Sequence, residues 1–79
     1  RYTAPSNELE NKMTIIWGRI LGIAPSKISL QDNFFRLGGN SLIAIKLIGL
    51  INKEFNSNIN VSLIFKYNTI DKLVSHIFH

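Results

Sequence analysis

The spacing of apolar residues is the feature that most restricts what this chain can fold into. Three stretches repeat apolar side chains every three or four residues, as one face of an α-helix does. The three stripes are Leu9, Met13, Ile16, Trp17, Ile20 and Leu21; Ala44, Leu47, Ile48, Ile51 and Phe55; and Ile70, Leu73, Val74, Ile77 and Phe78. No segment alternates apolar and polar residues convincingly, as a half-buried strand would. The sequence therefore predicts an all-α domain.

Capping residues set the expected ends of the first helix. Ser6 or Asn7 can serve as its N-cap, and Glu10, three residues after Asn7, would complete a loose capping box. Gly22 stands where a C-terminal cap belongs. We expect the first helix to lie between these residues.

Three further helices are expected after a long connection. The second runs from Ser41 to about Phe55, a short third lies within residues 62–66, and the last follows an N-cap at Thr69. Residues 23–40 show no helical period and contain many turn-forming residues, so they are expected to form a loop. Its apolar side chains are expected to pack into the bundle: Ile28, Leu30, Phe34, Phe35 and Leu37. This pattern predicts a four-helix bundle with a long loop between the first and second helices and a short third helix.

The size and composition of the chain exclude several kinds of protein. With 79 residues it has material for one small core and little for the walls of an enzyme pocket. It has no cysteine, which rules out disulfides and thiolate metal sites and is typical of a reducing compartment. No apolar run approaches the roughly 20 residues of a membrane span. We expect a cytoplasmic domain over residues 6–79, preceded by a linker remnant over residues 1–5, and assign no catalytic or metal-ligating residue.

The net charge of +4 raises the alternative of a small DNA-binding module. The lysines and arginines are scattered singly, however, which is typical of a solvated surface. The helix after the glycine turn also has Leu42, Ile43 and Ile45 where a recognition helix would offer polar side chains to bases. We therefore expect no nucleic-acid partner.

Ser41 is the candidate functional residue. Gly38 and Gly39 predict a tight turn that presents its hydroxyl at the start of a helix. Unpaired N–H groups and the positive end of the helix dipole there favour a phosphate ester. Serine is also a common N-cap, so local physics alone is compatible with an ordinary cap at Ser41.

The run Asp-Asn-Phe-Phe-Arg-Leu-Gly-Gly-Asn-Ser-Leu over residues 32–42 resembles the attachment motif of peptidyl carrier (thiolation) domains of nonribosomal peptide synthetases. The resemblance extends to the helix containing Trp17, to Leu63-Ile-Phe65 and to Asn68-Thr69-Ile70. It implies the phosphopantetheine-binding, acyl-carrier-like fold, a four-helix bundle. This agrees with the helices expected from periodicity.

The resemblance also implies a role for each residue of the site. Ser41 would receive 4′-phosphopantetheine from coenzyme A through a separate Mg²⁺-dependent phosphopantetheinyl transferase, with Gly39 and Asn40 completing the cofactor site. The thiol of this arm would hold an aminoacyl, aryl or peptidyl thioester and deliver it to adenylation, condensation and thioesterase domains. The domain itself would be a non-catalytic monomer without a membrane partner. An acyl carrier domain of a polyketide or hybrid pathway is the alternative within the same fold.

The side of the second helix opposite its core stripe is the expected docking surface. At about 100° per residue it carries Leu42, Ile45, Lys46, Gly49 and Lys53. Apolar residues flanked by lysines suggest a partner site, and Leu42, Ile45 and Lys46 match docking positions of the family. For Ile45, at the flank of the arc, a wider buried stripe is an equal alternative.

Two features leave alternatives open. Asn40 stands where the family more often has His or Asp, and an aspartate could add a carboxylate near the transferase's metal. A serine hydrolase using Ser41 with His76 or His79 as base is another class to test. The residues around Ser41 lack the second glycine of a nucleophile elbow, which argues against it.

Overall fold

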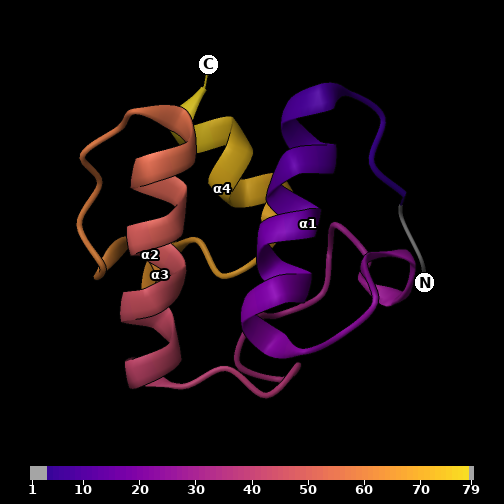
Figure 1. The fold of residues 1–79 in the computed structure, drawn as a ribbon, viewed down its shortest axis with the longest axis horizontal. Helices are drawn as coiled ribbons and strands as arrows, with labels where there is room; N and C mark the ends of the chain where they lie inside the picture. Colours follow the sequence, from indigo (N-terminus) through magenta and orange to yellow (C-terminus); the bar gives the residue numbers. More distant parts are fainter. Residues whose placement is uncertain (1–3, 79) are drawn as a thin grey trace.

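The computed structural model describes residues 4–78, and within them every regular element is helical (Figure 1). The elements are α1 (Glu8–Leu21), the 3₁₀ turn η1 (Pro25–Lys27), α2 (Ser41–Phe55), α3 (Leu63–Lys66) and α4 (Ile70–Ile77). The predicted all-α bundle, its long first connection and its short third helix are confirmed. The turn η1 was not predicted. It begins at Pro25, whose fixed φ suits the first position of a helical turn.

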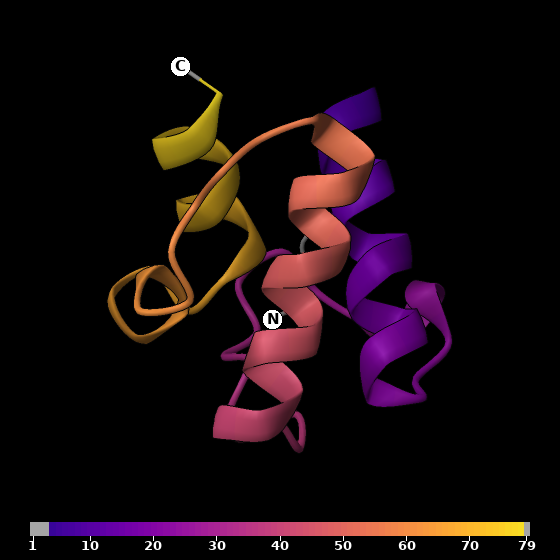
Figure 2. The same ribbon diagram turned by 60° about the vertical axis from the view of Figure 1, so that its left-hand side comes forward.

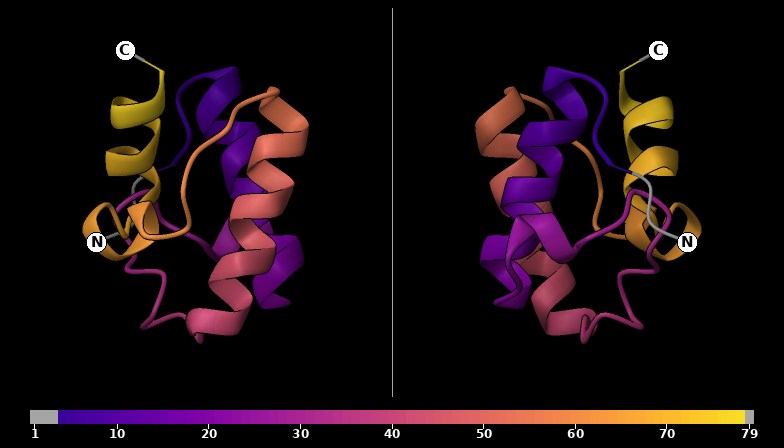
Figure 3. Two further views of the ribbon diagram at one scale, coloured as in Figure 1. Left: turned by 90° about the vertical axis from the view of Figure 1, so that its left-hand side faces the viewer. Right: turned by 90° about the vertical axis from the view of Figure 1, so that its right-hand side faces the viewer.

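The helices form a small bundle in which α1 contacts both α2 and α4. α2 packs antiparallel against α1, and α4 packs against another side of α1 (Figures 1 and 2). The connection between α1 and α2 passes around the lower end of the bundle and leads into the start of α2 (Figure 3). Among residues 4–78, no helix is both long and apolar enough to cross a membrane.

The ends of α1 form from the predicted capping residues. Asn7 Oδ1 accepts a hydrogen bond from the Glu10 backbone N–H at 2.8 Å, and Gly22 ends the helix with a φ of 71°. Glu10 Oε1 accepts a hydrogen bond from the Ser6 N–H at 2.8 Å. In a regular capping box the donor would be the N–H of the cap residue, Asn7, so this bond is shifted by one residue. These bonds satisfy backbone groups that a helix end leaves unpaired.

The long loop contributes a large share of the core. Ile28, Leu30 and Phe34 are buried, whereas Phe35 and Leu37 are only partly buried against the core. The Phe34 ring lies edge-on to Trp17 with centroids 5.2 Å apart. The loop is also tied to the last part of the chain by two backbone bonds, from Phe34 N–H to the Asn68 carbonyl at 2.8 Å and from Asp71 N–H to the Leu30 carbonyl at 3.1 Å. The predicted insertion of loop side chains is confirmed.

Candidate functional site

Ser41 is the first residue of α2, but it is not the cap of that helix. Asn40, with extended backbone angles, accepts a hydrogen bond from the Ile43 N–H on its Oδ1 at 2.9 Å. The Asn40 carbonyl accepts the Ala44 N–H at 2.8 Å. The alternative that Ser41 is an ordinary N-cap is therefore wrong. Ser41 is exposed, and its hydroxyl has no hydrogen-bond partner among residues 4–78.

The turn before Ser41 needs both of its glycines, each for a different reason. Gly38 has a φ of 107°, which side-chain-bearing residues rarely adopt. Gly39 lies against the Phe34 ring, so a Cβ there would be 2.4 Å from Phe34 Cε2. The Gly39 N–H also donates to the Phe34 carbonyl at 3.0 Å. These contacts with Phe34 hold the turn against the core and position the first residue of α2.

The start of α2 fits a phosphate ester on Ser41. The backbone N–H groups of Ser41 and Leu42 have no acceptor within the described residues, and the first turn of α2 contains no acidic side chain. Unpaired N–H groups at the positive end of a helix dipole attract an anion. The free N–H groups of Ser41 and Leu42 can therefore hold a phosphate, and Gly39 and Asn40 immediately precede them in the turn.

The outer face of α2, formed by Leu42, Ile45, Lys46, Gly49 and Lys53, is exposed along its length. Leu42 is 65% exposed and Ile45 58%. The alternative in which Ile45 belongs to a wider buried stripe is therefore wrong. The opposite stripe is the core face as predicted, with Ala44, Leu47, Ile48 and Ile51 buried. Apolar side chains this exposed on one helix face are typical of an interaction surface.

Sequence reasoning missed Phe65 as a surface residue. Phe65 lies on α3, is 53% exposed, and stacks on Phe35 with ring centroids 5.1 Å apart and an interplanar angle of 19°. Phe35 in turn lies edge-on to Phe34 at 5.2 Å. A row of aromatic rings therefore runs from Trp17 in the core to Phe65 at the surface. A helix of four residues is too short for periodicity to show which side faces out.

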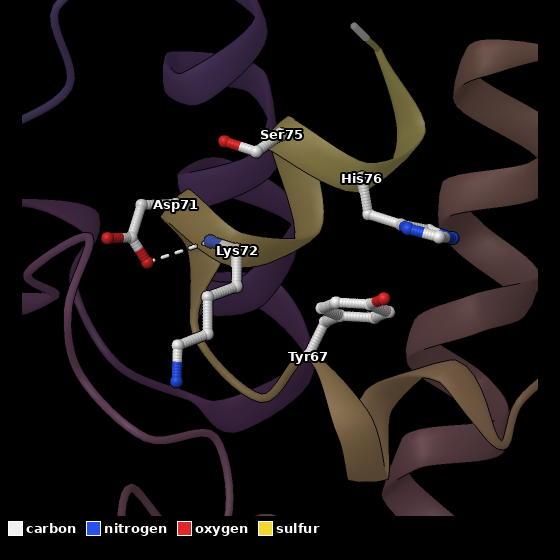
Figure 4. A pocket seen from close by; sticks show the side chains of 5 residues that line it. All are labelled: Tyr67, Asp71, Lys72, Ser75 and His76. Atoms are coloured by element: carbon white, nitrogen blue, oxygen red, sulfur yellow. Dashed lines mark hydrogen bonds between the residues drawn. The ribbon is translucent and has the colours of Figure 1, made fainter.

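His76, the base of the suggested hydrolase pair, lies in a different part of the fold from Ser41. The His76 ring stacks on Tyr67 with centroids 4.3 Å apart and lines an open hollow with Asp71, Lys72 and Ser75 (Figure 4). It belongs to α4, which lies at the end of the bundle opposite to the start of α2 (Figures 1 and 3). Ser41 and His76 are not brought together, and His79 lies outside the described residues. The structure provides no Ser41–His76 pair for a hydrolase.

Comparison with known protein families decides between the remaining classes. The family profile described as phosphopantetheine attachment site matches residues 11–77. This chain belongs to the phosphopantetheine attachment site family. Members are carrier domains, generally non-catalytic, within multidomain synthetases. The family predicted from the sequence, its phosphopantetheine cofactor and its fold are confirmed. The match therefore favours the carrier domain over the alternative of a small DNA-binding module.

Relatives of this phosphopantetheine attachment domain are found in peptide synthetases. The chain is 49% identical over 77 residues to gramicidin S synthase 2 of Brevibacillus brevis, covering 98% of this chain and 2% of that protein. It is 45% identical over 76 residues to tyrocidine synthase 2 of Brevibacillus parabrevis, covering 96% of this chain and 2% of that protein. The chain thus spans about 2% of the length of these curated relatives.

Solved structures of similar attachment domains have the same fold. One is a peptidyl carrier protein in complex with the phosphopantetheine transferase Sfp and coenzyme A, with a TM-score of 0.88, 35% identity and 95% of each chain covered. Another is the McyG A-PCP protein complexed with phenylalanyl-adenylate, with a TM-score of 0.90 and 30% identity over 98% of this chain and 12% of that one. The agreement extends over nearly the whole of this domain.

Proposed function

We propose that this chain is a peptidyl carrier domain of a nonribosomal peptide synthetase and that Ser41 carries its 4′-phosphopantetheine arm. The observation that carries the proposal is the uncommitted, exposed Ser41 hydroxyl, which begins α2 beside unpaired backbone N–H groups. Because Asn40 caps the helix, the hydroxyl is free to react. The carrier domain itself extends over residues 6–79, and the lack of cysteine supports a cytoplasmic location.

The chain contributes one nucleophilic atom to the loading reaction. Ser41 Oγ forms a bond to the β-phosphorus of coenzyme A while the bond from that phosphorus to the bridging oxygen breaks. 3′-Phosphoadenosine 5′-phosphate leaves, and the hydroxyl proton passes to a base of the transferase. The free N–H groups of Ser41 and Leu42 stabilise the resulting phosphodiester. Once attached, the arm supplies the thiol that holds the acyl group as a thioester.

The proposed partners follow from the similar proteins and from the exposed surface. A transferase of the kind seen with the related peptidyl carrier protein would load the arm, and adenylation, condensation and thioesterase domains would use it. Leu42, Ile45 and Lys46 on the outer face of α2 are the proposed docking residues, and exposed Phe65 on α3 extends the apolar surface. The domain is proposed to be monomeric on its own.

The peptide-synthetase relatives favour this function over an acyl carrier domain of a polyketide or hybrid pathway. The relatives with 49% and 45% identity are gramicidin S synthase 2 and tyrocidine synthase 2, respectively. By contrast, the HMG-ACPI domain of the CurA module from Lyngbya majuscula is 20% identical and shares only the fold. Loading of an amino acid onto the arm by an adenylation domain would distinguish a peptidyl carrier domain from an acyl carrier domain of a polyketide or hybrid pathway.

The test of the attachment site is modification in vitro. Incubation with coenzyme A and Sfp should add one phosphopantetheine, and Ser41→Ala should abolish the addition, as measured by intact-protein mass spectrometry. Circular dichroism should show that the Ser41→Ala chain stays folded, because the cap of α2 is Asn40. An unmodified wild-type chain with several active transferases, or a modified Ser41→Ala chain, would contradict the proposal.

A further inference from the structure

Asn52, near the end of α2, pairs its side-chain amide with the backbone of Ile59. Its Nδ2 donates a hydrogen bond to the Ile59 carbonyl at 3.1 Å, and its Oδ1 accepts the Ile59 N–H at 2.9 Å. The same oxygen accepts the Ser57 hydroxyl at 2.9 Å. Because an amide can donate and accept at once, Asn52 uses both ends of its side chain on the connection between α2 and α3.

The backbone of Asn52 also holds the start of this connection. Its carbonyl accepts the N–H of Asn56, the C-cap with a φ of 51°, and the N–H of Ser57 at 3.0 Å. Apart from the bonds into α3 itself, the hydrogen bonds that leave residues 57–62 all end on Asn52 within residues 4–78. The connection leaves the end of α2 and turns back toward the start of that helix (Figures 2 and 3). One residue therefore sets how the chain returns from α2 to α3.

α3 depends on its connections for its place in the fold. With four residues it is far below the length at which a helix is stable alone. Within residues 4–78, the extensive contacts between helices are those of α1 with α2, α4 and η1, and α3 takes part in none of them. Ile64 anchors α3 in the core, and after the helix the Asn68 carbonyl accepts the Phe34 N–H at 2.8 Å. Before the helix, the fixed point is the side chain of Asn52.

We propose that Asn52 is a positioning residue for recognition by partner domains, because it sets where α3 presents Phe65 beside the turn before Ser41. The inference rests on the proposed function of Ser41 and on Phe65 as part of the docking surface. Phe65 is 53% exposed and stacks on Phe35, whose neighbour Phe34 packs against the turn before Ser41. A shift of α3 would therefore move an apolar side chain relative to the serine that carries the arm.

A residue that only stabilised the end of α2 would behave differently. Its loss would lower the melting temperature, but the folded chain would keep the same surface, so the KM of a partner reaction would not change. Loss of a positioning residue raises that KM and leaves kcat unchanged, because the reacting arm is the same. The effect also disappears when Phe65 is removed, since there is then no side chain to misplace.

The experiment measures KM and kcat for loading of the chain by its cognate adenylation domain, after modification with Sfp and coenzyme A. Asn52→Leu keeps the size of the side chain but loses its three hydrogen bonds. It should raise KM about fivefold with kcat unchanged, and Phe65→Ala should raise KM about tenfold. In the double variant, Asn52→Leu should add nothing to the effect of Phe65→Ala. Asn52→Asp, which loses only the donor to Ile59, should give a smaller rise and replaces Asn52→Leu if that chain does not fold.

Two control variants separate position from stability. Asn7→Ala removes the N-cap of α1 and should lower the melting temperature by about 4–8 °C without changing KM. Ser57→Ala removes one bond to Asn52 but keeps both bonds between Asn52 and Ile59, so KM should again stay unchanged.

The proton chemical shifts of the Phe65 ring report the place of α3 directly, because the stacked Phe35 ring shields them. They should change in Asn52→Leu but not in Asn7→Ala. The positioning role is overturned if the folded Asn52→Leu chain keeps the wild-type KM or the wild-type ring shifts, or if its effect on KM adds fully to that of Phe65→Ala. A Phe65→Ala chain with the wild-type KM also overturns it. If the wild-type chain is never modified at Ser41, the proposed function fails instead, and the ring shifts still test the place of α3.

Discussion

At the scale of single residues, capping and attachment are divided between two neighbours. Asn40 satisfies the Ile43 N–H at 2.9 Å, so the hydroxyl of Ser41 is left without an intramolecular bond in the described chain. A serine that capped its own helix would have to break that bond before reacting. The division therefore keeps the nucleophile available while the first turn of α2 stays ordered.

Substitutions of Asn40 should separate its cap from any contact with the transferase. Asn40→Ala should lower the free energy of unfolding by about 1 kcal/mol and slow modification, because the first turn that presents Ser41 frays. Asn40→Ser should keep the free energy of unfolding and the rate of modification near their wild-type values, because serine caps a helix as well as asparagine does. Asn40→Asp keeps the cap and adds a carboxylate. If Asn40→Asp is modified faster than Asn40→Ser, the added carboxylate assists the reaction near the transferase's metal ion.

Chemical denaturation and the kcat/KM for Sfp with coenzyme A provide the two measurements. Protection of the Ile43 amide from hydrogen exchange reports directly on the cap. If Asn40→Ala is modified as fast as wild type while losing this protection, the positioning role of Asn40 is wrong.

At the scale of one element, α2 serves the core and a partner with opposite faces. Its core face buries Ala44, Leu47 and Ile51, whereas its outer face leaves Leu42 65% exposed. Burial of a leucine side chain contributes about 1.5–3 kcal/mol, and Leu42 contributes little of this to the isolated domain. That apolar area becomes useful only when a partner covers it.

Leu42→Asp should therefore weaken docking without unfolding the domain. We expect loading by the cognate adenylation domain to fall about tenfold or more, because docking would move a carboxylate out of water into a contact that an apolar side chain makes in the wild type. The circular dichroism spectrum should stay unchanged. Asn58→Asp, in the exposed turn after α2, controls for the added charge. Unchanged loading of a folded Leu42→Asp chain would remove Leu42 from the docking surface.

At the scale of the whole molecule, Phe34 connects the core with the attachment turn. Its ring is fully buried and lies edge-on to Trp17 with ring centroids 5.2 Å apart. The same ring packs against Gly39. The same residue bonds through its N–H to Asn68, just before α4. The loop between α1 and α2 is thus ordered by the bundle that it helps to fill.

Shortening the Phe34 side chain should damage stability and site together. Phe34→Leu is expected to lower the free energy of unfolding by about 2 kcal/mol through a partly filled cavity. It should also speed hydrogen exchange at the Gly39 amide, which donates to the Phe34 carbonyl. Phe35→Leu, at a partly buried neighbour, should cost less. Denaturant unfolding and exchange measurements test both, and equal costs for the two variants would contradict the special place of Phe34.

The sequence by itself determined the four helices, the caps of the first and the N-cap of the last, and the insertion of the loop into the core. These features depend on hydrogen bonds and side-chain spacing within a few residues, as at Asn7, Gly22 and Thr69, so local pattern was sufficient to predict them. The motif over residues 32–42 likewise pointed to Ser41 and to its family through residue identity and spacing alone.

Only the tertiary structure decided what faces the solvent at the edges of each stripe. Ile45 lies at the flank of its arc, Phe65 lies on a helix of one turn, and His76 is distant in sequence from Ser41. Their exposure and proximity depend on which elements pack together, and that is settled by the whole core. The same packing showed that Gly39 is required by Phe34 whereas Gly49 is not required by any neighbour.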